Sequence, residues 1–205
     1  MALCYYITAR HQLEAVAGNE KALQEKVRAA FSAGADYLQV REKDLPGGRL
    51  TNLVRILLSL PEKRKTRLLV NERLDVAIAC GADGVHLPTD SVPLPVVRAR
   101  GGEALLAGIS CHSVEQLEVA VQQKASYVLL GPIFETPSKP GAKPLGLSLL
   151  AQGCRRSPVP VFALGGVNLE NASACVQAGA AGIAGIRLFQ QAQELGEVCG
   201  RLHLL

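Results

Sequence analysis

The sequence predicts an α/β fold, a single (β/α)8 TIM barrel that spans residues 1–205. Short apolar runs alternate with amphipathic segments along the chain, and a similar joint recurs before every second apolar run. Hydrophobic residues make up 48% of the chain, whereas Trp is absent and Phe and Tyr number four each. Val, Leu, Ile and Ala must therefore form the core, which is typical of parallel strands buried on both faces.

The apolar runs predict eight strands, and the segments between them predict helices. The strands are expected at Leu3–Ala9, Tyr37–Arg41, Arg67–Asn71, Gly84–Leu87, Leu105–Ser110, Tyr127–Phe134, Val159–Gly165 and Gly182–Leu188. The amphipathic segments include Lys21–Ser32, Leu50–Leu60, Leu74–Cys80, Val114–Gln123 and Leu169–Gln177. Strands and helices that alternate at this spacing indicate parallel βα units.

Related joints precede the second, fourth, sixth and eighth predicted strands. Gly34, Gly81 and Gly179 stand where a helix ends in a left-handed residue, and Lys124 takes that place in the third joint at some conformational cost. A doubly wound open sheet could carry the same joints. The count of eight strands favours the closed barrel.

Charge and cysteine content limit the partners. The net charge of +4 is compatible with anionic ligands but too weak and dispersed for nucleic acid. The six cysteines show no metal-ligand spacing, and Cys4, Cys80 and Cys175 are interpreted as small core residues. No signal peptide and no apolar run near the ~18 residues of a membrane span are found, so a reduced cytoplasmic protein without a membrane partner is expected. A homo-oligomer is left open.

In a closed barrel, polar residues at the carboxyl ends of the strands converge on one mouth. After the second strand, alternation directs Gln39, Arg41 and Lys43 to the same side, which predicts a diphosphate site. The alternative is an ion-paired strand end in which Glu42 and Asp44 neutralise their neighbours.

Two carboxylates follow adjacent strands. Glu72 follows Asn71 at the end of the third strand, and Asp90 lies just beyond the fourth. Such a pair could hold Mg²⁺, which prefers oxygen ligands and substrate phosphates. Alternatively, Glu72 is a surface acid and Asp90 caps a turn. His86 is more typical of a hydrogen-bonded barrel residue than of a ligand.

The fifth strand ends in a candidate acid/base. Ser113 followed by Gln116 predicts a capping box, which directs Ser110 and His112 to the mouth. Histidine titrates near neutrality, so His112 is the candidate general acid/base. Cys111 points the opposite way, which disfavours a Cys–His nucleophile.

The long segment 131–141 after the sixth strand carries Thr136, Ser138 and Lys139, which suit a phosphate clamp and a lid. An ordinary flexible connection is the alternative. After the seventh and eighth strands, Gly165 with Gly166 and then Arg187 stand where barrels commonly bind phosphate.

Five segments in this order and spacing resemble the thiamin-phosphate synthase and thiazole tautomerase (TenI) superfamily: Gln39–Asp44, Gly84–Leu87, Gly108–Ser110 with His112, Gly131–Lys139 and Ala163–Val167. The resemblance spans nearly the whole chain. It implies a transferase that joins hydroxymethylpyrimidine diphosphate to thiazole phosphate and releases diphosphate with the help of Mg²⁺. The partners would then be small phosphorylated pyrimidine and thiazole substrates.

The resemblance also implies roles by position. The residues that would hold the diphosphate are Gln39, Arg41, Lys43 and Asn71, with Ser110 and Lys139 assisting. The residues that would hold the thiazole phosphate are Thr136, Ser138, Gly166 and the loop after the eighth strand.

Three departures bear on the branch within the superfamily. Glu72 stands where the synthases have Asp, Asp90 lies one position before the second metal Asp, and Arg187 replaces a Ser. The tautomerase branch lacks both metal acids and uses a His at the place of His112. The synthase is placed first because the charge pattern of the diphosphate site is kept; a tautomerase and a non-catalytic binder of thiamin phosphates are the alternatives.

Overall fold

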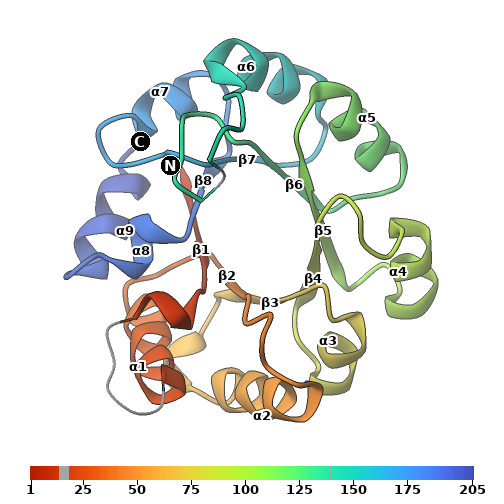
Figure 1. Ribbon diagram of the computed structural model, residues 1–205, viewed down its shortest axis with the longest axis vertical. Helices are drawn as coiled ribbons and strands as arrows, with labels where there is room; N and C mark the ends of the chain where they lie inside the picture. The colour runs from red at the N-terminus through yellow and green to blue at the C-terminus, as the bar shows by residue number, and fades with distance from the viewer. Residues whose placement is uncertain (14–18, 139) are drawn as a thin grey trace.

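The computed structural model describes residues 1–13, 19–138 and 140–205. Within these residues, parallel strands pair in chain order and close into a barrel (Figure 1). The strands are β1 (Leu3–Ile7), β2 (Tyr37–Val40), β3 (Arg67–Asn71), β4 (Gly84–Leu87), β5 (Leu106–Cys111), β6 (Tyr127–Leu130), β7 (Val161–Leu164) and β8 (Gly182–Gly185). The predicted (β/α)8 TIM barrel is confirmed.

Helices surround the ring of strands (Figure 1). They are α1 (Asn19–Ser32), α2 (Gly47–Leu58), α3 (Leu74–Cys80), α4 (Leu94–Gly101), α5 (Val114–Gln122), α6 (Gly146–Arg156), α7 (Ala172–Gln177), α8 (Arg187–Gln190) and α9 (Leu195–His203), with 3-10 turns η1 (Arg10–Gln12) and η2 (Pro61–Lys63). None of the described helices has the length and apolar character needed to cross a bilayer.

Five strands are shorter than their apolar runs: β1 ends at Ile7 rather than Ala9, β2 ends at Val40 rather than Arg41, and the others are β6, β7 and β8. β6 ends at Leu130 rather than Phe134, and β7 begins at Val161 rather than Val159. Pro132 and Pro160 stand at these limits, and proline cannot donate to a strand ladder. β8 ends at Gly185 because Arg187 already begins α8.

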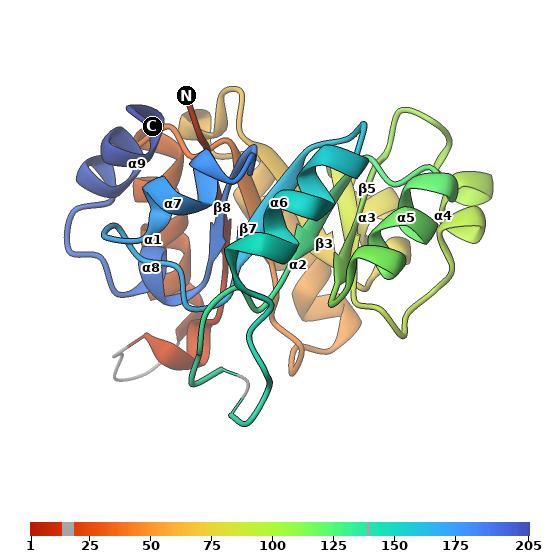
Figure 2. The same cartoon turned by 90° about the horizontal axis from the view of Figure 1, so that it is seen from above.

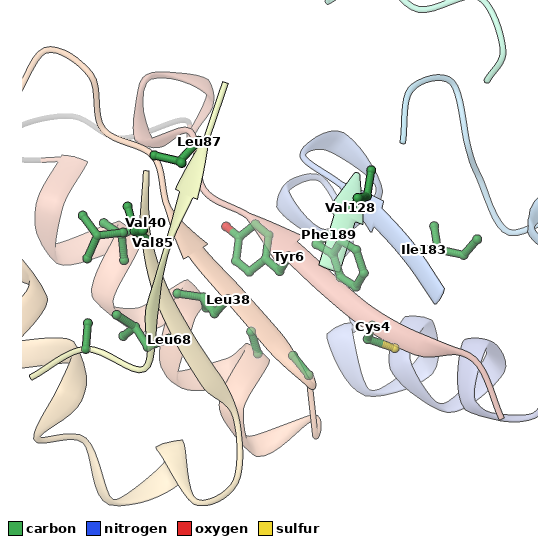
Figure 3. Close-up of a cluster of buried hydrophobic side chains, with 14 of the residues drawn as sticks. Cys4, Tyr6, Leu38, Val40, Leu68, Val85, Leu87, Val128, Ile183 and Phe189 are labelled. Carbon is green, nitrogen blue, oxygen red and sulfur yellow. The ribbon is translucent and has the colours of Figure 1, made fainter. Parts of the chain in front are cut away.

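Two hydrophobic clusters fill the molecule. The larger lies between the barrel and its helices and contains aliphatic side chains with Tyr6 and Phe189 (Figure 3). The smaller includes Tyr5, Tyr127 and Phe162, so the aliphatic core expected from composition is wrong for this part. A Cβ atom at Gly108 would overlap the Tyr127 ring. Glycine on β5 therefore makes room for a tyrosine on β6, a small–large pairing that barrel interiors require.

The repeated joints share one geometry. Gly34, Gly81 and Gly179 adopt φ of +81°, +66° and +99°, and Lys124 takes the same region at +64°. Two residues after Gly34, Gly81 and Lys124, a side chain accepts a hydrogen bond from a backbone N–H of β1, β3 and β5, respectively. These bonds are Cys4 N to Asp36 Oδ2 (2.8 Å), Leu68 N to Asp83 Oδ2 (2.8 Å) and Ala107 N to Ser126 Oγ (3.0 Å).

Candidate active site

A cavity of about 590 Å³ opens at the carboxyl ends of the strands. The described part of the β6–α6 connection projects from this end, opposite the chain termini (Figure 2). The predicted site residues that line the cavity are Gln39, Arg41, Lys43, Asn71, Ser110, His112, Thr136, Ser138, Gly165, Gly166 and Arg187. Among the described lining residues, neither Glu72 nor Asp90 occurs. Lys139 lies outside the described residues.

The end of β2 presents donors to the cavity. Gln39, Arg41 and Lys43 line it, as alternation predicts. Gln39 is 1% exposed, and its Nε2 has no hydrogen-bond partner among the described residues. A buried donor without a partner is costly, so this amide group is set up to donate to a ligand.

Arg10 neutralises the two acids of this segment. Its guanidinium forms two bonds of 2.6 Å to Asp44 and one of 3.3 Å to Glu42. Thr8 Oγ1 donates to Glu42 Oε1 at 2.6 Å and accepts from Arg41 N at 2.9 Å. The hydrogen bonds from Arg10 hold the pKa of Asp44 at about 2. The alternative in which Glu42 and Asp44 neutralise their neighbours is therefore wrong: both acids pair with Arg10 instead of Arg41 or Lys43.

Glu72 turns back toward β2. Its φ of +61° lies in the left-handed region, where strained non-glycine residues often mark functional sites. Its Oε2 accepts from Asn71 Nδ2 at 2.8 Å and pairs with Lys43 Nζ at 3.2 Å. Asp90 is exposed on the connection after β4. Because one carboxylate is already paired and the other does not line the cavity, the two do not fit a ready-made Mg²⁺ site, which needs converging oxygens.

A chain of hydrogen bonds runs from the cavity into the barrel. Ser110 Oγ lies 2.9 Å from His86 Nε2, and His86 Nδ1 lies 3.1 Å from the Tyr127 hydroxyl. That hydroxyl is 2.8 Å from the Tyr5 hydroxyl. Burial, together with the charge of Arg41, lowers the pKa of His86 to about 3. His86 is therefore a neutral, hydrogen-bonded barrel histidine that orients Ser110.

The titration of His86 predicts a pH effect on stability. Its folded-state pKa of about 3 lies below its ordinary 6.5, so the unfolded chain binds the proton more tightly. Stability should be lost as pH falls from 6.5 toward 3, with a slope of about 1.4 kcal/mol per pH unit from this residue. Chemical denaturation between pH 4 and 7 should show a flatter profile for His86→Gln, whereas the exposed-site control His11→Gln should keep the wild-type slope. Parallel profiles for His86→Gln and wild type would contradict a buried neutral His86.

His112 faces the same cavity from the short connection between β5 and α5. Its Nδ1 is hydrogen-bonded to the carbonyl of Gly131, and since a carbonyl can only accept, Nδ1 carries the proton. Ser113 Oγ accepts from Gln116 N at 3.2 Å, and Gln116 Oε1 accepts from His112 N at 2.7 Å. The predicted cap is thus present, with its return bond one residue earlier than in a standard capping box. Cys111 is buried on the opposite side, as expected.

The loops after β6, β7 and β8 form the other side of the cavity. Arg187 Nη2 donates to Thr136 Oγ1 at 3.2 Å, which joins the β6 and β8 sides. Gly165 and Gly166 have φ of +92° and +69°, and Cβ atoms there would lie 2.6 Å from Pro132 and 2.7 Å from Phe134. The glycines therefore also allow the β6 loop to lie directly against the β7 loop.

Some residues at the site were missed by the sequence analysis. Thr89 and Asn168 line the cavity, and Thr89 Oγ1 donates to Ser110 O at 3.0 Å. Arg10 and Tyr127 act from behind the cavity wall through Asp44 and His86. Thr89 and Asn168 lie in the polar segments after the fourth and seventh strands, so their position was the available signal. Arg10 and Tyr127 depend on contacts between distant parts of the chain, which local patterns do not reveal.

This chain is similar in sequence and fold to known proteins. The family model described as Thiamine monophosphate synthase matches residues 4–189. The chain is 42% identical over 183 residues to Thiamine-phosphate synthase of Roseiflexus sp. (strain RS-1), covering 89% of this chain and 75% of that protein. It is 41% identical over 181 residues to Putative thiamine-phosphate synthase of Geobacter sulfurreducens, covering 88% and 83%. The solved structure of thiamine phosphate pyrophosphorylase from Pyrococcus furiosus superposes with a TM-score of 0.85 at 30% identity, covering 98% of this chain and 94% of that one.

Proposed function

The chain belongs to the thiamine monophosphate synthase family, and from this premise we propose that it is a transferase that joins hydroxymethylpyrimidine diphosphate to thiazole phosphate. In this reaction the C–O bond to diphosphate breaks, and the bonding pair leaves with diphosphate. The thiazole nitrogen then forms the new C–N bond. The products are thiamin phosphate and diphosphate.

The unpartnered amide of Gln39 supports this proposal most directly. Its Nε2 lies in the same cavity wall as Arg41 and Lys43. Three donors on one strand end suit a ligand with several anionic oxygens, because Arg can donate two bonds and Lys adds a point charge. A departing diphosphate gains charge as the C–O bond breaks, so these groups bind the transition state more strongly than the ground state.

The far side of the cavity suits the second substrate. We assign the thiazole phosphate to Thr136, Ser138, Gly165, Gly166 and Arg187, which lie across the cavity mouth from the β2 donors. A cavity of about 590 Å³ is within the usual range for small-molecule sites and can hold both substrates. Ser110, oriented by neutral His86, would donate to the diphosphate between the two anionic groups. Catalysis then comes mainly from positioning and fixed charge.

The described residues of the site do not provide the two converging carboxylates on which the Mg²⁺ prediction rests. Glu72 supplies one carboxylate beside Asn71, but it is paired with Lys43, and Asp90 is exposed elsewhere. The chain's cations can neutralise part of the diphosphate charge by themselves.

The decisive assay supplies purified protein with both substrates, with and without Mg²⁺ and EDTA. Thiamin phosphate and diphosphate should form in equal amounts, and the EDTA arm tests the Mg²⁺ prediction. Tight calorimetric binding of both substrates without any product would contradict the transferase and select the non-catalytic binder.

A thiazole tautomerase is the second candidate, and the geometry of His112 favours it. Because Nδ1 carries its proton in the hydrogen bond to the Gly131 carbonyl, the basic nitrogen of the neutral ring is Nε2. A proton shuttle requires one such basic nitrogen. This candidate predicts metal-independent conversion of thiazole tautomers that is lost in His112→Ala. An EDTA-sensitive conversion would count against it.

A further inference from the structure

A second group of reactive side chains lies at the amino-terminal end of the barrel, away from the cavity. Cys4 on β1, Asp36 before β2 and His203 at the end of α9 place their ligand atoms within 4.8 Å of one another. His203 Nε2 is 3.0 Å from Asp36 Oδ2. Cys4 is fully buried and points toward the carboxyl-terminal helices (Figure 3).

A second thiol adjoins this group. Cys199 lies four residues before His203 on α9, a spacing that places both side chains on one helix face. Cys4 Sγ is 3.8 Å from the Cys199 carbonyl oxygen. Cys199 is therefore adjacent to Cys4 through its backbone, one helical turn before His203.

The internal repeat provides a comparison for Asp36. Asp83 holds the equivalent joint position and makes the equivalent bond to a backbone N–H. At Asp83 the carboxylate is paired with Lys63 at 2.9 Å and Arg67 at 3.4 Å. Among the described residues, the ion-pair partner of Asp36 is His203 instead. In the described part of the chain, the permanent cations Lys63 and Arg67 beside Asp83 thus have no counterpart beside Asp36. Asp36 has an imidazole and a thiol near it instead, and these are side chains that bind soft metal ions.

We propose that Cys4, Asp36, Cys199 and His203 bind a Zn²⁺ ion. Cys, His and Asp side chains are all zinc ligands, and four of them complete a tetrahedral site. Such sites have metal–ligand bonds of about 2.0–2.3 Å, so the ligand atoms of Cys4, Asp36 and His203, which lie within 4.8 Å of one another, need only small side-chain shifts to converge. Cys199 is outside that group, so its side chain has to turn toward them to become the fourth ligand. Thiolate and imidazole ligands select zinc over Mg²⁺ or Ca²⁺.

The exposure of the ligands determines how an ion reaches the site, and the elements that carry them determine what the ion holds together. The side chains of Asp36 and His203 are 26% and 27% exposed, so an ion can enter from their side while both cysteines stay buried. Each thiol that becomes a thiolate ligand releases one proton. The ion would join β1, the start of β2 and α9 at the barrel end that commonly serves stability.

The test uses the full chain stripped of metal and titrated with Co²⁺, whose thiolate complexes absorb in the near ultraviolet. One equivalent should saturate this absorbance, and Zn²⁺ should displace it and raise the Tm. Both effects concern ligation and stability rather than enzyme activity. Binding without a thiolate band, or no saturable binding, overturns the proposal.

Variants assign the ligands. His203→Gln should weaken Co²⁺ binding by more than about 10-fold, since even an outer-shell partner is worth 10–100-fold. Cys199→Ser should remove part of the thiolate band. Controls are His11→Gln and Cys175→Ser, a matched exposed histidine and a matched buried cysteine, which should bind as wild type.

If the cysteine variants fail to fold, the partly exposed His203 decides alone: unchanged binding in His203→Gln overturns the site. A loss of two mass units that assigns a Cys4–Cys199 disulfide to the freshly purified protein also overturns it.

Discussion

Replacing Arg41 with Met should lower kcat/KM for the pyrimidine diphosphate by about 10²–10³-fold. Hydrogen bonds to charged groups contribute about 1.5–3 kcal/mol each, and a guanidinium can make two to a diphosphate. A loss of about 3–4 kcal/mol corresponds to this rate factor. Stability should change little, because the backbone N–H of Arg41 keeps its bond to Thr8 and no described carboxylate lies within ion-pair distance of its side chain.

The division between kcat and KM tests the role of Arg41 further. Charge on the diphosphate grows as it departs, so kcat should fall and not only KM rise. Arg156→Met is the matched control, since Arg156 pairs with Glu118 between α6 and α5 and does not line the cavity. Equal kcat/KM values for Arg41→Met and Arg156→Met would contradict a diphosphate site at the end of β2.

Local patterns predicted the donors of this site but not their balance of charge. Two-residue alternation along β2 was enough to direct Gln39, Arg41 and Lys43 to the cavity. Which cation neutralises Glu42 could not be predicted, because Arg10 lies 32 residues earlier in the chain. That contact depends on how β1 and the turn after it lie beside β2. Arg41 and Lys43 are thereby spared from pairing with the two acids of their own segment.

The positions of Glu72 and Asp90 also depend on structure that the strand pattern does not reveal. Adjacent strand ends predicted that Glu72 and Asp90 would converge, since β3 and β4 are neighbours. The φ of +61° at Glu72 instead turns its side chain toward Asn71 and Lys43, and Asp90 lies exposed beyond the strand. Backbone direction in the first residues after a strand is set by loop geometry. Strand periodicity carried past the end of β2 to Arg41 and Lys43, but it does not carry past the end of β3 to Glu72.

Composition also gave an incomplete view of the barrel interior. Val, Leu, Ile and Ala do form most of the core around the barrel, yet Tyr5, Tyr127 and Phe162 meet in its smaller cluster. Their ring centroids lie 5.3–5.8 Å apart. A few aromatics can be concentrated at one place only by strand register, which composition does not reveal. Two of them carry hydroxyl groups that need partners there.

Tyr127→Phe should therefore be among the most destabilising conservative changes in the chain. It removes the hydroxyl that links His86 Nδ1 to Tyr5, and leaves two buried polar groups without this partner. Each such group costs about 1–3 kcal/mol, so a loss of about 2–6 kcal/mol is expected. For a chain of this size that corresponds to a Tm lower by about 4–24 °C. Calorimetry measures it directly.

Tyr5→Phe is the matched control because it removes a hydroxyl from the other end of the same bond. In that variant Tyr127 keeps its bond to His86, so only one buried hydrogen bond, worth about 1 kcal/mol, is lost. Tyr127→Phe should also reduce kcat, since His86 loses the contact that fixes its ring and therefore the orientation of Ser110. Equal losses of Tm in the two variants would mean that His86 does not depend on Tyr127. The chain from Ser110 to Tyr5 would then be a set of separate contacts rather than a support for the site.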